Sequence, residues 1–157
     1  MTGREFDCDL PLDITVNVED GKITSVDMKR GKKKALVCRV NSDAAVAKQV
    51  FDWLDSYTRR VQPKIALPLK FPEQGFSRNV LEHLRKIPFG KTQSYKEIAE
   101  RTGVPKGARA VGGACGANPF PLFIPCHRVL RTDGAIGGFS AGGPEVKKML
   151  LSFEEKK

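Results

Sequence analysis

The chain has 157 residues, of which 40% are hydrophobic and 29% charged, a composition typical of a soluble globular protein and unlike that of a disordered tail. No apolar run approaches the roughly 20 residues of a membrane span, and the acidic start is unlike a signal peptide, so we expect a cytoplasmic protein, or a nuclear one in a eukaryote. The formal net charge of +9 fits a nucleic-acid partner and fits a solvated basic surface equally well.

The pattern of apolar residues over 14–40 predicts a small antiparallel sheet. Apolar and polar residues alternate over residues 14–18, and a second apolar stretch covers 23–28. Between them lies Asp20-Gly21, a dipeptide typical of tight two-residue hairpins. After a basic turn, a third apolar run at 35–40 would complete an antiparallel meander with one exposed face.

One helix follows this sheet. Ser42 or Asp43 can serve as its N-cap. Apolar residues then recur at helical spacing, and this stripe would pack on the sheet. The stripe consists of Val46, Val50, Trp53, Leu54 and Tyr57. We interpret Trp53 as a core residue.

The chain divides into two predicted domains of an α+β protein. Three prolines and weak periodicity between residues 61 and 72 indicate a linker. We therefore expect an N-terminal α/β supporting domain at 1–62, a linker at 63–72 and a C-terminal domain at 73–157.

Three helices predict a helix-turn-helix, winged-helix-like unit in the C-terminal domain. Apolar spacing indicates a first helix over 76–87. Ser94 and Glu97 form a capping box that opens a second helix at 95–101. A third helix is expected at 108–117.

The third of these helices is unusually bare. It holds Gly112 and Gly113, each of which costs about 1 kcal/mol relative to alanine, and Arg109 is its one long side chain. This pattern fits a close helix–helix crossing in the core, and it also fits a helix whose backbone approaches a nucleic-acid groove. Such a helix is suited to shape-driven binding rather than to reading base edges.

The cysteines are few and scattered. We interpret them as free thiols of a reducing compartment, with one candidate reactive thiol. No cofactor or metal is predicted, although a zinc site with an unusual ligand set such as Cys8, Cys38 and His83 stays open. The four cysteines are Cys8, Cys38, Cys115 and Cys126.

Residues 118–129 are the most informative segment. Three prolines stiffen the approach to Cys126, which His127 and Arg128 follow directly. A thiol attacks as the thiolate, and basic neighbours favour that form. Adjacent side chains usually diverge, so the Cys126-His127 pair by itself fits a buried, inert cysteine as well as a nucleophile.

Four segments together resemble the O6-alkylguanine-DNA alkyltransferases, also called methylated-DNA–protein-cysteine methyltransferases. One is the segment just described, which starts with Asn-Pro and ends with Pro-Cys-His-Arg-Val. The other three are Phe-Gly-Lys-Thr-Gln-Ser-Tyr at 89–95, Ala-Arg-Ala-Val-Gly-Gly-Ala at 108–114 and Gly-Phe-Ser-Ala-Gly-Gly at 138–143. The resemblance is close over residues 72–154. The front half shares only the strand-then-helix layout.

The resemblance implies a DNA repair protein that restores guanine directly. Cys126 would accept the alkyl group from the O6 atom of a damaged guanine. His127 would act through a water as the base for this thiol, and Glu154 would orient His127. Asn118 would be the hinge residue that ties the helix end to the active-site loop. Because a thioether has no easy hydrolytic exit, each molecule would act once.

The resemblance also implies how DNA is held. Arg109 would enter the base stack in place of the flipped nucleotide. Tyr95 and Ser140 would form hydrogen bonds to the extruded base or assist proton delivery as it leaves. The expected partner is double-stranded DNA, bound through its minor groove by a monomer, with no membrane. The other implied contacts to DNA or to the base are Ala108, Ala110, Gly112, Ser94 and Phe139.

Two features depart from the family's pattern, and one choice rests on periodicity. Phe139 stands where many members have tyrosine, and the loop at 140–144 is one residue longer than the common form. The buried stripe of the last helix, which comprises Val146, Met149, Leu150 and Phe153, favours Glu154 over Glu155 as the acid. Two frayed glutamates in water are the alternative.

Three other functions are weighed against this one. An alkyltransferase-like protein would recognise lesions without repairing them, but such proteins lack the thiol that Cys126 supplies. A cysteine hydrolase would need an oxyanion hole and would leave Arg109 and its bare helix unexplained. A plain helix-turn-helix regulator would need polar residues that read base edges.

Overall fold

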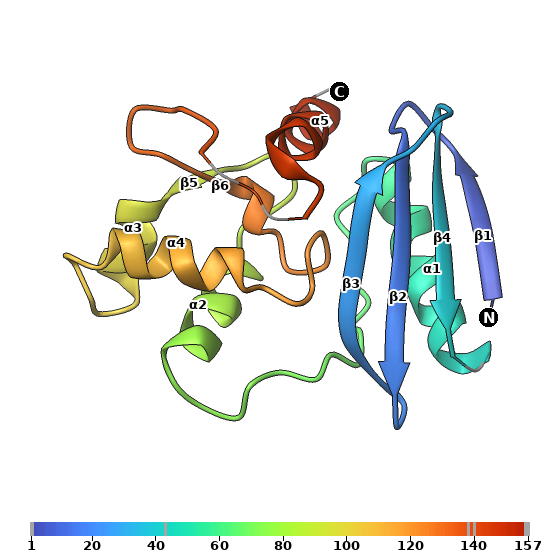
Figure 1. Ribbon diagram of the computed structural model, residues 1–157, viewed down its shortest axis with the longest axis horizontal. Helices are drawn as coiled ribbons and strands as arrows, with labels where there is room; N and C mark the ends of the chain where they lie inside the picture. Colours follow the sequence, from blue (N-terminus) through green and yellow to red (C-terminus); the bar gives the residue numbers. More distant parts are fainter. Residues whose placement is uncertain (1, 43, 138, 140, 156–157) are drawn as a thin grey trace.

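A four-stranded sheet forms the N-terminal part of the computed structural model, which describes residues 2–42, 44–137, 139 and 141–155 (Figure 1). The strands are β1 (Thr2–Asp7), β2 (Leu12–Glu19), β3 (Lys22–Arg30) and β4 (Ala35–Asn41), in the spatial order β1-β4-β2-β3. The predicted hairpin at Asp20-Gly21 joins β2 to β3, and both residues have positive φ angles, of 51° and 74°.

The predicted antiparallel meander is wrong in its pairing. β4 does not pair with β3. It lies on the other side of β2 and pairs with that strand in parallel, with Leu12 opposite Leu36. β1 then pairs antiparallel with β4. Residue periodicity shows which face of a strand is buried but not which strand lies beside it. β1 was missed because Phe6 is its one buried residue, which leaves no apolar alternation to detect.

Helix α1 (Ala44–Thr58) lies across one face of this sheet and packs on β1 and β4 (Figure 1). The predicted helix is confirmed, and all five residues of its predicted stripe are buried. Of the two candidate caps, Asp43 lies outside the described residues. The segment after α1 is extended and is fixed to β3, because Ile23 donates to the carbonyl of Pro68 and accepts from the amide of Lys70.

The C-terminal part is mainly helical. Its elements are α2 (Phe76–Leu84), β5 (Gln93–Ser94), α3 (Tyr95–Arg101), α4 (Ala108–Gly116), η1 (Cys126–Arg128), β6 (Val129–Leu130) and α5 (Gly143–Glu155). α4 packs against both α2 and α3, as the predicted helix-turn-helix requires. α2 ends three residues before its predicted end, so Ile87 is buried without being helical. Within the described ranges, no helix combines the length and apolar character that a membrane crossing requires.

The start of α3 places Tyr95, and the predicted capping box is confirmed there. The Ser94 hydroxyl accepts from the Glu97 amide at 3.0 Å, and the Glu97 carboxylate accepts from the Ser94 amide at 3.1 Å. Two backbone N–H groups that the helix cannot satisfy are thus paired, which fixes the first turn of α3.

We expect Ser94→Ala to lower the free energy of unfolding by about 1 kcal/mol, because the cap is lost. Chemical denaturation measures this change. Ser152→Ala is the control, since Ser152 is exposed within α5 and alanine is the better helix former. Equal stability of the two variants would contradict the role of the cap.

Candidate active site

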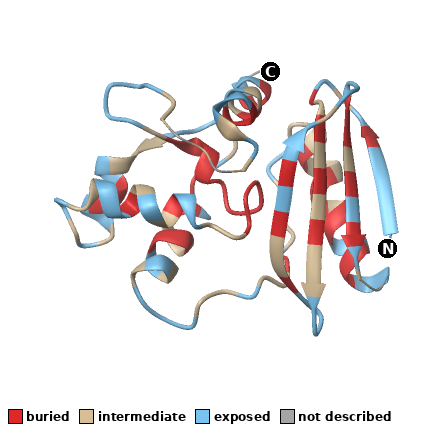
Figure 2. Cartoon of the chain, viewed as in Figure 1, coloured by how far each residue is buried: buried red, intermediate tan, exposed pale blue. Residues whose placement is uncertain are grey.

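Cys126 lies at the end of a fully buried loop. Residues 120–129 are all buried, and they form the continuous red segment of Figure 2 between the helices and the sheet. The Asn118 side chain closes this loop: its Nδ2 donates to the carbonyl of Ile124 at 3.0 Å and to Cys126 Sγ at 3.2 Å. Its Oδ1 accepts from the amide of Phe120 at 2.9 Å. One amide therefore fixes both the loop and the thiol.

Cys126 is 3% exposed, and its surroundings favour the neutral thiol. Burial raises the pKa of the thiol above its ordinary value, and the hydrogen bond from Asn118 and the charge of Lys147 oppose this shift only in part. The thiol is therefore protonated at neutral pH. It needs a base before it can attack as the thiolate.

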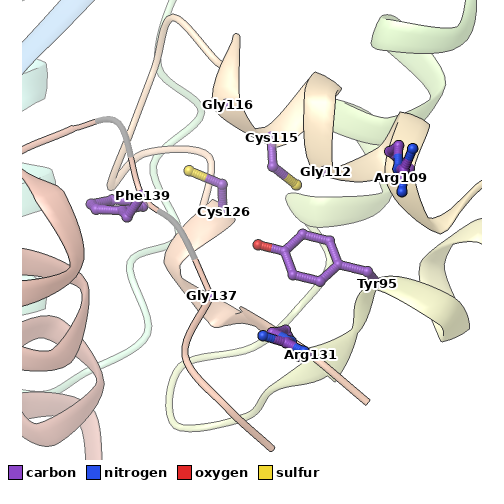
Figure 3. A pocket seen from close by; sticks show the side chains of 9 residues that line it. All are labelled: Tyr95, Arg109, Gly112, Cys115, Gly116, Cys126, Arg131, Gly137 and Phe139. Atoms are coloured by element: carbon purple, nitrogen blue, oxygen red, sulfur yellow. The ribbon is translucent and has the colours of Figure 1, made fainter. Parts of the chain in front are cut away.

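Cys126 lines a pocket of about 530 Å³ between α4 and the segment that precedes α5 (Figure 3). In this view the Tyr95 hydroxyl points toward the side of the pocket that holds the two cysteines, whereas Arg109 lies farther along α4. The residues that line the pocket are Tyr95, Arg109, Gly112, Cys115, Gly116, Cys126, Arg131, Gly137 and Phe139.

A buried lysine lies behind the tyrosine of this pocket. Lys147 is fully buried, and its Nζ lies 3.4 Å from the Tyr95 hydroxyl and 5.6 Å from the centre of the ring. Burial lowers the pKa of Lys147, while the nearby Cys126 and Cys115 act against that shift. The pKa of Tyr95 is raised to about 12, first by burial and then by the same two cysteines. Tyr95 therefore keeps its hydroxyl proton at neutral pH.

On the other side of Cys126, the Glu154 carboxylate accepts three hydrogen bonds. Its Oε2 accepts from His127 Nε2 at 2.6 Å and from the Tyr57 hydroxyl at 2.6 Å. Its Oε1 accepts from Arg128 Nε at 2.7 Å, and Arg128 also donates to the carbonyl of Ile87 at 2.7 Å. All four side chains of this network are buried, so each charge depends on the others.

The network fixes the protonation state of His127. Burial alone would raise the pKa of Glu154, but His127 and Arg128 lower it to about 2, so the carboxylate is ionised and can only accept. Burial lowers the pKa of His127, which leaves the imidazole neutral with its proton on Nε2. Its buried Nδ1 has no hydrogen-bond partner in the described part of the chain. A neutral imidazole with an unprotonated Nδ1 is a base.

The surface of α4 is smooth. Arg109 and Ala110 are exposed, as is Gly113 one turn further along the helix. Val111 and Cys115 are buried on the opposite side. The helix thus presents a nearly bare backbone with a single arginine beside the mouth of the pocket.

Comparison with known proteins assigns the chain to a family. Residues 75–156 match the model described as 6-O-methylguanine DNA methyltransferase, DNA binding domain. The chain belongs to this methyltransferase family. A methylated-DNA–protein-cysteine methyltransferase of Mus musculus is 49% identical over 109 residues, which are 65% of this chain and 52% of that one. The constitutive enzyme of Bacillus subtilis is 38% identical over 101 residues, 64% of this chain and 61% of that one.

Solved structures show the same fold. The Mycobacterium tuberculosis OGT, in a crystal structure in complex with DNA, has a TM-score of 0.72 and 28% identity, and the match covers 91% of this chain and 92% of that one. The chain spans about half the length of the mammalian relatives that it matches.

The methyltransferase-family residues predicted from sequence fall into two groups. Asn118, His127 and Glu154 surround the loop of Cys126, whereas Glu155 is exposed. Tyr95, Phe139, Gly112 and Arg109 line the pocket with Cys126. Ala108 is half-buried beside Arg109, and Ser94 caps α3. Ser140 lies outside the described residues.

Sequence reasoning missed Lys147, Tyr57 and Cys115, and it did not assign Arg128 to the acid. A lysine within a helix is usually exposed, and Met149, expected in the buried stripe, is only half-buried. Lys147 is buried next to Val146 in the chain, and nothing in the sequence around it indicates that this lysine is buried. The open zinc alternative gains no support from His83, whose Nε2 bonds to Gln93 at 2.8 Å. Nowhere in the described ranges do three potential metal-binding side chains gather.

The lowered pKa of Glu154 predicts how stability depends on pH. The unfolded carboxyl, with an ordinary pKa of 4.5, takes up a proton before the folded one does, so the free energy of unfolding falls as the pH drops from that value toward 2. We expect a shallower fall in Glu154→Gln. At neutral pH this variant should be about 3 kcal/mol less stable, because Arg128 loses its buried anion.

Denaturation at a series of pH values measures both effects. Glu155→Gln is the matched control, because this side chain is exposed and should leave the wild-type curve unchanged. A Glu154→Gln curve parallel to that of the wild type would show that Glu154 is not held ionised by its partners.

Proposed function

We propose that this protein repairs O6-alkylguanine in double-stranded DNA by moving the alkyl group onto Cys126 in a single, irreversible turnover. The observation that carries the proposal is a buried thiol that lines a pocket and is followed directly by a histidine that burial keeps neutral and a buried carboxylate orients. Membership of the methyltransferase family supports it. The DNA complex of the M. tuberculosis protein supports DNA as the partner.

The first step makes the thiolate. Nδ1 of His127 takes the thiol proton of Cys126 through a bridging water, and Glu154 stabilises the imidazolium that results. Asn118 Nδ2 and the Lys147 ammonium then stabilise the sulfur anion, because each favours the charged form. A base positioned in this way typically contributes about 10²–10⁴-fold to the rate.

The second step is an in-line displacement. The sulfur of Cys126 forms a bond to the alkyl carbon, the bond from that carbon to O6 breaks, and its electron pair stays on the guanine. The hydroxyl of Tyr95 gives the leaving base a proton, and the adjacent Lys147 ammonium stabilises the phenolate that remains. The products are intact guanine and a thioether, which has no route back to the thiol.

The lesion reaches this pocket by leaving the base stack. The O6 substituent lies inside the duplex, so the nucleotide must be extruded before sulfur can approach it. The bare surface of α4, including Ala108 and Ala110, supports binding in a minor groove, and we propose that the exposed Arg109 fills the gap that the base leaves. We propose that one monomer does this, with residues 73–157 carrying DNA binding and transfer and residues 1–62 supporting them.

Cys126→Ala should abolish transfer and keep DNA binding, because the DNA-facing helix does not depend on the thiol. Mass spectrometry after incubation with an O6-methylguanine duplex should find one added methyl group on wild-type Cys126 and none on the variant. Cys8→Ser, on a half-buried thiol of the N-terminal part, is the control that should stay active. Loss of the lesion with the alanine variant would show that another residue is the nucleophile.

Arg109→Ala should slow repair strongly in a fully paired duplex and much less on a single-stranded lesion. Extruding a paired base costs a few kcal/mol that the inserted side chain offsets, and a single strand has little to offset. Single-turnover rates on the two substrates measure this difference. Lys106→Ala, which removes an exposed cation just before α4, should affect both substrates alike. A uniform loss with Arg109→Ala would instead make Arg109 a phosphate contact.

A further inference from the structure

The N-terminal part of the chain contacts the Glu154 carboxylate through a tyrosine side chain. Tyr57 lies in the last turn of α1, and its hydroxyl donates to Glu154 Oε2 at 2.6 Å, across 97 residues of sequence. The same oxygen accepts from His127 Nε2 at 2.6 Å. One oxygen of Glu154 therefore accepts hydrogen bonds both from His127 of the C-terminal part and from Tyr57 of the N-terminal part.

The tyrosine ring is held firmly. Trp53 stacks on it at 5.4 Å between centroids, Phe153 at 5.6 Å, and Phe89 meets it edge-on at 5.4 Å. Tyr57 is fully buried, and burial followed by the charge of Glu154 raises its pKa well above the ordinary value. The hydroxyl thus keeps its proton and remains a hydrogen-bond donor at neutral pH.

A second contact fixes the end of α1 to the end of α5. Arg60, three residues beyond Tyr57, donates from Nε to the carbonyl of Phe153 at 3.1 Å, and its guanidinium lies 4.0 Å above the Phe153 ring. The backbone amide of Phe89 also donates to Gln62 at 2.6 Å. The Tyr57 hydroxyl therefore faces a carboxylate whose helix also contacts the segment just after α1.

We propose that Tyr57 is a positioning residue of the transfer reaction, which through Glu154 orients His127 and sets how strongly that imidazole attracts a proton. The proposal rests on the proposed function, because it assigns His127 the role of base. It also gives the N-terminal part a task in the chemistry beyond support.

The physical reason is the division of charge on one oxygen. A hydrogen bond to an ionised carboxylate stabilises its charge, so the bond from Tyr57 weakens the pull of Oε2 on the His127 proton. Without that hydroxyl, His127 alone faces Oε2, and its protonated form is favoured. The other ionisable groups that act on Tyr57, Glu154 and His127 are Arg128 of η1, Lys147 of α5 and Cys8 after β1, and none of them changes in the test.

Tyr57→Phe keeps the ring and removes only the hydroxyl. We expect single-turnover transfer to Cys126 at neutral pH to slow by roughly tenfold, because Glu154 loses one of the bonds that orient it and more of His127 is already protonated and unable to take the thiol proton. The pH below which the rate is lost should move upward, because His127 then takes a proton more readily. DNA affinity should stay at the wild-type value, since Tyr57 is buried away from α4.

Arg60→Met is the matched control on the same helix end. It loses the bond to the Phe153 carbonyl and leaves all three partners of Glu154 in place, so it should lower stability without moving the pH profile. A ring-fluorinated tyrosine introduced at position 57 is the second variant. It keeps the packing and donates more strongly, so it should move the rate loss to lower pH, and it serves if the phenylalanine variant does not fold.

The outcomes separate the two proposals. A wild-type protein that leaves Cys126 unmodified on lesion DNA overturns the proposed function, and the role of Tyr57 with it. A wild-type protein that transfers normally, with position 57 variants that match it in rate and in pH profile, overturns the role of Tyr57 alone. A pH shift in Arg60→Met equal to that in Tyr57→Phe would mean that helix docking, not the hydroxyl, controls His127.

Discussion

An ionised carboxylate shut away from water is the constraint around which the rest of this structure is arranged. Glu154 is 5% exposed, and such a group is stable only if hydrogen bonds and an opposite charge replace the water it has lost. Its partners come from η1 and from α1. The hydrogen bonds to Glu154 therefore bring together the last helix, the segment that begins at Cys126 and the N-terminal part of the chain.

In the proposed function, recognition of DNA and transfer of the alkyl group use different surfaces of the same small region. α4 is exposed and almost without long side chains, which suits close approach to a duplex, while the thiol and its base are buried behind it. The pocket connects these two surfaces, because Arg109, Tyr95 and Cys126 are all among its lining residues (Figure 3). In the proposed reaction, an extruded base meets a thiol that is 3% exposed, so Asn118 and Lys147 act on the sulfur with little screening by water.

Local features of the fold were readable from the sequence, and long-range ones were not. The cap at Ser94 and the stripe of α1 depend on residues within a few turns, and both were predicted closely. The strand that pairs with β4 is β2, two strands earlier in the chain, and the spacing of apolar residues does not indicate this pairing. Motif resemblance located the residues around Cys126, but the bond from Tyr57 to Glu154 joins residues that no local pattern relates, and Lys147 resembles an ordinary surface lysine.

Burial keeps His127 neutral, and the ionised Glu154 carboxylate, which can only accept, keeps the imidazole proton on Nε2. Nitrogen-15 NMR of the imidazole at neutral pH tests this directly, and His83 is the one other histidine from which the signals must be distinguished. We expect a protonated Nε2 and an unprotonated Nδ1. An imidazolium, or a proton on Nδ1 instead, would contradict it, because His127 then has no lone pair available for the thiol proton.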